Sequence, residues 1–489
     1  MSGSSRIEHS VNRPAPVAGR VGVSLAAKLV SVVSGLCFIA VTTREFSKEE
    51  VAVLAVAAIM TSVMDVSKGL GLGPLLMKRL PGLLANSGGA AAPQAGSLIA
   101  SYMAYSAAPP AILAAAGWAS APALSNYWFG GPGYAWEIRL GIAAGLATVV
   151  TNSSLALLLT ARRFADWAKL SGAASMLQRM APCAVAALFP VSLGQFMTAM
   201  AVLSAAASLP ALWPVAGLIR AHHGRILPPA AFWLESRHYY GSSVLRYLAA
   251  QADQLLVAAL CEPASLAVYY VLRRLYSIAV MTMDSFFDAL VPDLSKRAAE
   301  DAAGARALLD DWVRLTFYGG TIGAAALAAN GPRLVDLIAG AGYSDSRLLL
   351  AVFAATAVSF FLLGLSQVDI LLFGESQSVL TVAASSAGVG GVSGAVLGSV
   401  WGPVGLAAGL MAGHWAGLLA ARRAGRGYFR LRTLAVAMSV IAAAGLLSAC
   451  SEAGFPAWFA LLLGNGLIVL FGWVHYRRWQ VEACLRRIQ

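Results

Sequence analysis

The chain has 489 residues, of which 58% are hydrophobic and only 12% are charged, and its formal net charge is +12. Soluble domains carry about 25% charged residues, so this composition excludes a soluble enzyme and predicts an all-α, polytopic membrane protein. The sequence offers no basic face on a soluble domain, so the positive charge does not indicate nucleic-acid binding. The five cysteines form no CxxC pair, and we expect no metal, disulfide framework or other cofactor.

Apolar segments of the length that crosses a bilayer, about 20 residues, follow one another along the whole chain. They predict about 14 transmembrane helices, at residues 21–41, 51–77, 95–119, 139–160, 170–190, 194–219, 240–260, 264–292, 312–339, 347–373, 377–400, 402–421, 431–450 and 455–475. Pro109 and Pro110 are helix-breaking signals inside one of these segments. The loops between the segments are short, and no GxxxxGK[ST] motif is present, so ATP does not drive this protein directly.

The basic residues outside the spans are distributed unevenly between alternate loops. If the N-terminus is cytoplasmic, 24 of the 35 Lys and Arg residues fall on the cytoplasmic side and only five on the opposite side. Loops rich in Lys and Arg stay in the cytoplasm. The distribution therefore predicts an even number of spans with both termini cytoplasmic.

A second population of charges lies within the apolar spans. An ionised side chain at the bilayer centre costs about 2.5–3.5 kcal/mol on the insertion scale, so such residues usually face a polar path or one another. Because basic residues outnumber acidic ones, we expect a path for an anion. The basic residues are Lys28, Lys68, Arg179, Arg246, Arg273 and Arg274, and the acidic ones are Asp65, Asp253, Asp284 and Asp369.

Three pairs of opposite charge have spacings that place both members near one face of a single helix. They are Arg246 with Asp253, Arg273 with Asp284, and Asp65 with Lys68. One interpretation is that these are compensating ion pairs that hold the protein together. The other is that the basic residues bind an anionic substrate, while one of the four aspartates titrates or binds a coupling cation.

The remaining intramembrane charges also leave alternatives open. Lys28 is close enough to the start of its span to reach the interface with its long side chain. Arg179 lies in the middle of its span, so we expect it to face a cavity or a boundary between helix bundles. Asp369 is a candidate for ion coupling or for a neutral structural role.

Three stretches resemble the bacterial polysaccharide flippases of the Wzx type, in the multidrug/oligosaccharidyl-lipid/polysaccharide (MOP) exporter superfamily. The first is FSKEEVAVLAVAAIMTSVMDVSKGLGLGPLLMKR at 46–79, with a Gly-Leu-Gly segment before its basic end. The second is LLLTARRFADWAKL at 157–170, and the third is YLAAQADQLLVAALCEPASLAVYYVLRRLYSIA at 247–279. The third departs from the family where Glu262-Pro263 and Ala267 stand in place of glycine.

This resemblance implies two six-helix lobes around a central cavity, two additional C-terminal helices, and transport by alternating access. It implies a bacterial inner-membrane flippase for undecaprenyl-pyrophosphate-linked oligosaccharide repeat units, whose further partners are membrane lipids and a polysaccharide polymerase and export machinery. The corresponding divisions are a cytoplasmic tail at 1–20, an N-lobe at 21–220, an inter-lobe loop at 221–238, a C-lobe at 239–421, two helices within 422–475, and a basic tail at 476–489.

Three alternatives remain. A lipid II flippase shares the helix number and the cationic cavity that the resemblance implies. A multidrug cation antiporter of the same superfamily should present net acid inside the membrane, and the intramembrane charges here are mainly basic. A membrane-embedded glycan polymerase or acyltransferase needs catalytic residues in loops outside the membrane, and the loops predicted there are short.

The predicted topology can be checked with reporter fusions placed after Arg20 and after Gln489. Both reporters should read as cytoplasmic, because the positive-inside distribution puts both termini on that side. Reporters that read on opposite sides would require an odd number of spans.

Overall fold

The computed structural model describes residues 17–85, 91–161, 163–222, 224–277, 301–343, 347–374 and 376–423, with the single residues 280, 294, 298 and 466. The described part is helical with short connections and contains no strand, as the composition predicts. The end of the predicted eighth span and the last two predicted spans lie outside the described residues.

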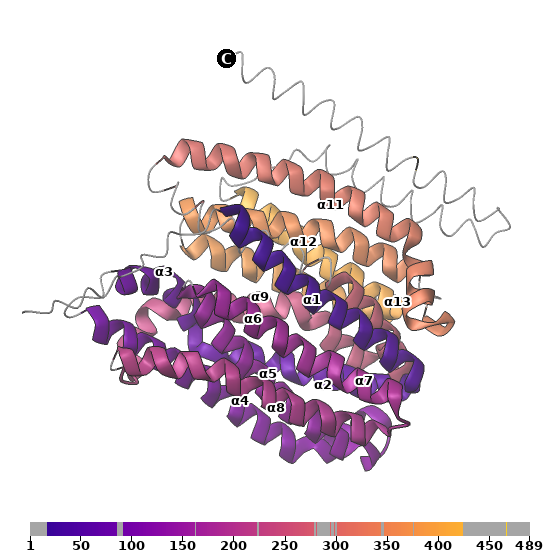
Figure 1. Ribbon diagram of the computed structural model, residues 1–489. Coiled ribbons are helices and arrows are strands. Elements are labelled where there is room, and N and C mark those ends of the chain that lie inside the picture. Colours follow the sequence, from indigo (N-terminus) through magenta and orange to yellow (C-terminus); the bar gives the residue numbers. More distant parts are fainter. Residues whose placement is uncertain are drawn as a thin grey trace, which may run out of the picture.

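The helices lie side by side and form an elongated bundle (Figure 1). Their bounds are α1 Val17–Glu45, α2 Lys48–Ser67, α3 Leu72–Ala85, α4 Ala91–Phe129, α5 Ala135–Thr160, α6 Phe164–Ser175, α7 Ala181–Leu188, α8 Leu193–Ala221, α9 Ala230–Leu260, α11 Ala302–Ala339, α12 Arg347–Phe373 and α13 Ser376–Arg423. Short 3₁₀ turns are η1 Lys68–Gly71, η2 Pro132–Tyr134 and η4 Ala341–Tyr343, and η3 Met176–Met180 is a π-helical turn. Residues 263–277 form a further helix.

By their packing the helices fall into two groups, which we call the N-lobe (α1 to α8) and the C-lobe (α9, the 263–277 helix and α11 to α13). In Figure 1, α2 to α8 lie below α11 to α13, and α1 crosses from the level of α12 to the lower helices. Within the described residues, six helices are long and apolar enough to cross a membrane. They are Lys48–Ser67, Pro93–Phe129, Pro132–Thr160, Leu193–Ala221, Arg347–Ile370 and Gln377–Arg423.

Sequence signals at helix ends explain several boundaries. Ser47 and Glu50 form a capping box at the start of α2, in which each side chain bonds the other residue's backbone N–H. Ser192 and Gln195 do the same at the start of α8. These reciprocal bonds satisfy two N–H groups that a helix start would otherwise leave unpaired, so the helices begin at fixed residues.

Helix α4 continues through Pro109 and Pro110, in agreement with the predicted 95–119 span; in a membrane bundle, neighbouring groups can satisfy the backbone that proline frees. One boundary differs from the sequence prediction. Helix α9 begins at Ala230, inside the predicted 221–238 loop. Leu227, in the part of the loop before α9, is held against α4, because its N–H donates to Ser101 Oγ at 2.8 Å.

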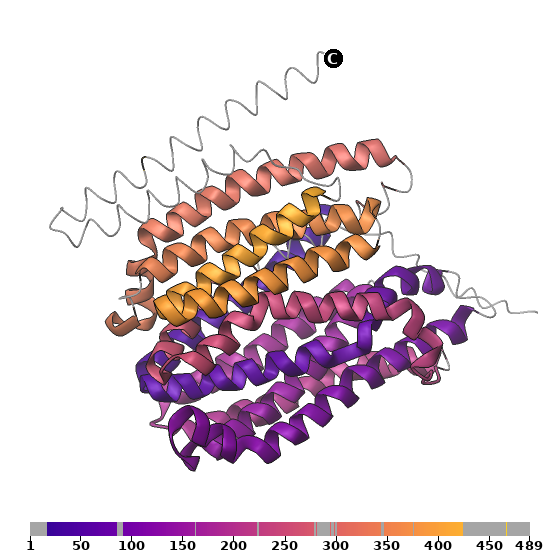
Figure 2. The same ribbon diagram turned by 180° about the vertical axis from the view of Figure 1, so that it is seen from behind.

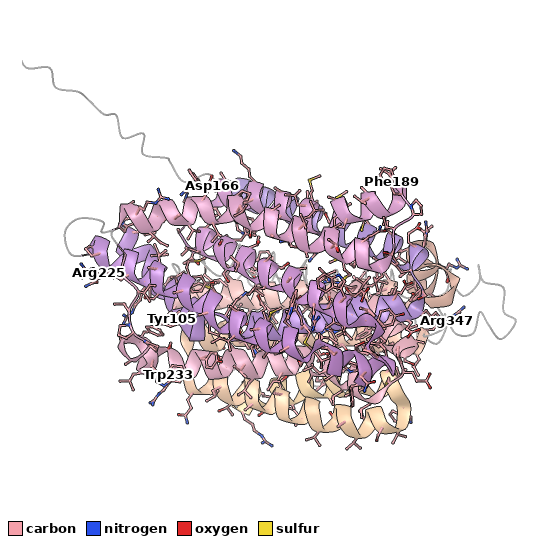
Figure 3. The ribbon with its side chains drawn as sticks, turned by 90° about the horizontal axis from the view of Figure 1, so that it is seen from below. Tyr105, Asp166, Phe189, Arg225, Trp233 and Arg347 are labelled. Carbon is pink, nitrogen blue, oxygen red and sulfur yellow. The ribbon has the colours of Figure 1, made fainter. Side chains whose placement is uncertain are left out.

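The two ends of the bundle carry the residues that the topology prediction assigns to opposite sides. Figure 3 shows Arg225 and Trp233 at one end and Phe189 and Arg347 at the other. Arg225 belongs to a predicted cytoplasmic loop and Arg347 to a predicted loop on the far side. The segments that carry Arg225 and Arg347 therefore lie at opposite ends of the bundle, as loops on opposite sides of a membrane would.

Helix α13 consists of two limbs that meet at Gly402, whose positive φ of 55° and ψ of −135° break the helix where the sequence predicts a boundary. The two limbs, orange and yellow in Figure 2, lie side by side. They pack through glycines at every fourth position. A Cβ atom at Gly413 would lie 2.6 Å from the Ser386 carbonyl oxygen and 2.8 Å from Gly390 Cα. Small residues at this spacing let membrane helices approach backbone to backbone.

Substituting Gly413 by Val should destabilise the protein by about 1–3 kcal/mol, the usual cost of overpacking a tight contact. Gly391 is the matched control, because it lies on the same helix with open space at its Cβ position. Thermal unfolding of the purified protein in detergent measures both. Equal melting temperatures for Gly413→Val and Gly391→Val would contradict the close packing of the limbs.

Candidate functional site

A buried ion pair joins two helices of the C-lobe. Asp253 on α9 and Arg273 on the 263–277 helix are only 3% and 6% exposed. Arg273 Nε donates to Asp253 Oδ2 at 2.9 Å, and the Tyr269 hydroxyl donates to the same oxygen at 2.6 Å. The Arg273 guanidinium also lies 4.5 Å from the centre of the Tyr276 ring. These contacts fix the 263–277 helix against α9.

The second carboxylate oxygen of Asp253 is left without a partner. Oδ1 is buried and accepts no hydrogen bond from the described residues. Asp253 lines a cavity of about 10 Å³ together with Leu256 of α9 and Gly390 and Gly394 of α13. A cavity of this size holds about one water molecule. A buried carboxylate oxygen without a hydrogen-bond partner is costly in an apolar setting, so a small polar ligand in the adjoining cavity would be stabilised by contact with this oxygen.

Arg273 is buried in an ion pair in this conformation, as the first of the two sequence interpretations describes. Its partner is different from the one expected. The sequence indicates pairs along single helices, Arg246 with Asp253 and Arg273 with Asp284, whereas the observed pair connects Asp253 and Arg273 across two helices. Removing either charge from a buried pair leaves the other uncompensated, so Arg273 serves here as the counter-ion of Asp253.

Arg179 lies at the edge of the N-lobe in the π-helical turn η3. Such turns widen a helix locally and are common at functional sites. Its Nη1 atom is 3.4 Å from both the backbone oxygen and the hydroxyl of Ser31 on α1, which is long for a hydrogen bond. The neighbouring Gln178 has a buried side-chain nitrogen with no partner in the described part of the chain. The η3 turn therefore offers N–H donors of Arg179 and Gln178 that the described residues satisfy weakly or not at all.

Arg274, on the 263–277 helix of the C-lobe, lies close enough to Arg179 for the two charges to interact. The two positive charges repel each other, and Tyr270 is close to both. The Arg274 guanidinium lies 5.6 Å from the centre of the Tyr270 ring. In the described ranges, neither arginine has a carboxylate within salt-bridge distance. The pair is thus a concentration of positive charge to which each lobe contributes one residue.

Lys68 is paired in the way that its spacing predicts. Its Nζ atom lies 2.6 Å from Asp65 Oδ1, where α2 gives way to η1. The Gly-Leu-Gly segment that follows has positive φ at Gly69 and Gly71. A Cβ atom on Gly71 would lie 2.8 Å from the backbone nitrogen of Tyr240 on α9. The pair therefore sits beside a close contact between the lobes, and Lys68 is not free to bind a ligand in this state.

Four other predicted site residues are placed less completely. Lys28 is on α1, one turn before Ser31, and Arg246 is on α9, two turns before Asp253, but neither side chain is among the described ones. Asp284 lies outside the described residues. Asp369 is 2% exposed near the end of α12 and has no described cation within salt-bridge distance.

His414 is a buried polar residue that the sequence analysis did not select. It is 2% exposed on α13, and its Nδ1 atom is 3.2 Å from the Ser359 hydroxyl oxygen on α12. The positive charge of Arg273 reaches this imidazole. A histidine within an apolar span was the signal that could have found it. His414 extends the polar cluster of the C-lobe from Asp253 and Arg273 to a third and a fourth helix.

The fold is that of MOP-type transporters. A lipid II flippase, MurJ, in an inward closed conformation has a TM-score of 0.62 at 11% identity, covering 93% of this chain and 99% of its own. A mutant of the Vibrio cholerae MATE transporter VcmN has a TM-score of 0.62 at 16% identity, covering 84% of this chain and 97% of its own. An inward-facing multidrug resistance MATE transporter of the MOP superfamily has a TM-score of 0.63 at 11% identity, covering 86% of this chain and 99% of its own. No protein-family model and no curated protein matches the sequence.

The Asp253–Arg273 pair can be tested by a double-mutant cycle. Asp253→Ala should destabilise the protein by about 3–5 kcal/mol, because it leaves a buried guanidinium without its counter-ion. Asp253→Ala combined with Arg273→Met should recover most of this loss, since both charges are then absent. Thermal unfolding in detergent provides the measurement.

The matched control is Asp166→Ala, which removes an exposed ion pair with Arg163 at 2.6 Å and should cost at most about 1 kcal/mol. If Asp253→Ala were no more harmful than Asp166→Ala, the pair would not carry the stabilising role given to it.

Proposed function

We propose that this protein is a flippase of the bacterial inner membrane, with both termini in the cytoplasm. It moves polyprenyl-pyrophosphate-linked oligosaccharide repeat units across the bilayer for the biosynthesis of surface polysaccharide. Transport proceeds by alternating access of two lobes, without covalent change to the substrate. The observation that carries the proposal is the pair formed by Arg179 and Arg274, which come from different lobes and share no described carboxylate.

The chemistry of this pair suits a pyrophosphate. A guanidinium presents several N–H donors in one plane and can hold two phosphate oxygens at once. The long contacts of Arg179 with Ser31 and the unpaired nitrogen of Gln178 leave donors available on the N-lobe side. A pyrophosphate headgroup cannot cross hydrocarbon unaided, and these groups would provide its counter-charge within the membrane.

The position of the pair at the boundary between the lobes connects binding to movement. Without a ligand, Arg179 and Arg274 repel each other. A bound anion removes this repulsion and attracts both lobes at once, so it favours the state in which they meet around it. A ligand shifts a conformational equilibrium only by its differential affinity for the two states, and a charge shared between lobes provides that difference.

The buried carboxylates are proposed to couple transport to an ion gradient. Asp253 is the first choice, because Oδ1 is unpaired beside a water-sized cavity. Asp65, Asp284 and Asp369 are the other candidates. Protonation of Asp253 would weaken its hold on Arg273 and free the 263–277 helix, which carries Arg274, to move.

A lipid II flippase is the second candidate function. The similarity to MurJ, named as a lipid II flippase, favours it, and lipid II also carries a pyrophosphate. The substrates differ in their glycan, which the arginine pair does not contact in this proposal. The similarity to MATE transporters would also suit a multidrug cation antiporter. Two arginines at the lobe boundary with no carboxylate partner among the described residues disfavour a cationic substrate.

The proposal predicts that Arg179→Ala with Arg274→Ala abolishes surface polysaccharide in a strain that depends on this protein, while the protein still inserts. Replacing both by Lys should retain part of the activity, because charge is kept and the planar fork is lost. Arg246→Ala should also abolish export and Arg246→Lys should retain part of it, if that side chain joins the same site. Surface polysaccharide and membrane protein level are measured together.

Arg163→Ala is the matched control, because Arg163 is paired with Asp166 on the surface and away from the lobe boundary. Export at the wild-type level by the Arg179→Ala, Arg274→Ala variant would remove the proposed substrate site. Failure of growth with peptidoglycan precursors accumulating, and not with polysaccharide intermediates, would identify the lipid II flippase instead.

A further inference from the structure

Two cationic side chains of the N-lobe contact the C-lobe at the end of the bundle that carries Arg347 (Figure 3). Arg44, in the last turn of α1, donates from Nη2 to the backbone oxygen of Leu337 on α11 at 2.8 Å. Lys48, the first residue of α2, places Nζ 5.6 Å from the centre of the Tyr343 ring in η4. The α1–α2 turn therefore meets the α11–η4 corner through two positive charges and no described carboxylate.

On both sides of this contact, local hydrogen bonds fix the backbone where a helix begins or ends. On the N-lobe side, the capping box of Ser47 sets the start of α2, and Phe46 is buried with its ring 5.1 Å from that of Phe196 on α8. On the C-lobe side, Gly340 ends α11 with a positive φ of 86°, and its N–H donates to the backbone oxygen of Asp336. The Tyr343 N–H then donates to the Gly340 oxygen at 3.3 Å.

The chemistry of the contact suits a reversible bond. The last carbonyls of a helix lack intrahelical donors and carry partial negative charge, so Arg44 at the end of α11 is favourably placed. The electron-rich face of the Tyr343 ring attracts the Lys48 ammonium at 5.6 Å. Arg44 and Lys48 are themselves exposed, so water can replace their contacts when the lobes part.

Buried apolar residues adjoin both halves of this contact in the sequence. Phe46 of the N-lobe lies between Arg44 and Lys48, and Ala339 and Tyr343 of the C-lobe follow Leu337; all three belong to the same buried hydrophobic cluster, which includes residues of both lobes. Parting the lobes at this end would expose part of that cluster to water. The two cationic contacts and the buried apolar residues thus favour the same closed arrangement.

We propose that Arg44 and Lys48 form a latch that holds the lobes together at the end opposite Arg225, and that its release opens the substrate path on the non-cytoplasmic side. The proposal rests on the proposed function for the requirement that the lobes part during transport. The latch proposal adds the residues that determine the fraction of molecules in which the lobes are apart. The latch is selective for a cation on the N-lobe side, because its C-lobe half offers a carbonyl oxygen and an aromatic face.

The latch can be tested by the distance between spin labels on the two lobes, measured by double electron–electron resonance on the full-length protein. The labels are placed at Tyr127 on α4 and Leu348 on α12, which are 68% and 65% exposed, after the five native cysteines are replaced by alanine. Arg44→Ala with Lys48→Ala should increase the long-distance population several-fold. Arg44→Lys with the native Lys48 should give an intermediate increase.

Arg139→Ala is the matched control. Arg139 donates to the backbone oxygen of Trp118 at 3.2 Å and lies 5.8 Å from the Trp118 ring centre, so it makes the same kinds of contact within the N-lobe alone. Its removal should leave the distances unchanged. An unchanged distribution in the Arg44→Ala, Lys48→Ala variant, or an equal change with Arg139→Ala, would overturn the latch.

A reversible lock provides a second measurement that does not depend on weakening the protein. A Cβ atom at Gly342 would lie 3.4 Å from Lys48 Cε, so Lys48→Cys and Gly342→Cys can be joined by a short thiol-cleavable cross-linker, with reduction-stable spin labels attached at positions 127 and 348 through unnatural side chains that do not react with thiol reagents. The joined protein should lose the long-distance population and regain it on reduction. Joined protein that still reaches the long distance would refute the latch. If the distances respond as expected but no lipid-linked glycan is moved, the proposed function fails while the latch stands.

Discussion

The packing of the helices depends on how the charged side chains within these apolar helices are neutralised. Asp253 and Arg273 are the clearest case, because each is nearly inaccessible and each is the other's counter-ion. Their bond, with that of Tyr269, fixes the 263–277 helix against α9. Arg274 is the next residue on that helix, so the buried pair also determines the position of a guanidinium that has no carboxylate partner among the described residues.

The presence or absence of a carboxylate partner also distinguishes structural basic residues from candidates for ligand binding. Lys68 and Arg273 have carboxylate partners, whereas Arg179 and Arg274 have none among the described residues. The two unpaired arginines approach from opposite lobes, and the lobes are built from helices with close glycine contacts such as those within α13. A charge imbalance located at a boundary between lobes is well suited to an anion whose binding and release accompany relative movement.

The sequence predicted the features that depend on one helix at a time. Hydrophobic length gave the helical class, three-residue spacing gave the Asp65–Lys68 pair, and Gly402 marked the break within α13. It could not identify the partner of Asp253, because periodicity shows which residues share a face and not which helix lies against that face. His414 was missed for the same reason, since a single polar residue gains meaning only from its neighbours.

The central claim is that the arginines at the lobe boundary recognise a pyrophosphate. Equilibrium binding of undecaprenyl pyrophosphate and of uncharged undecaprenol to the purified protein tests it most directly, because the two ligands share the same lipid tail. The account predicts that the pyrophosphate binds more tightly, and that the Arg179→Ala, Arg274→Ala variant loses this preference while its affinity for undecaprenol is unchanged. Equal affinities of the native protein for the two lipids, or a preference that survives in the variant, would contradict it.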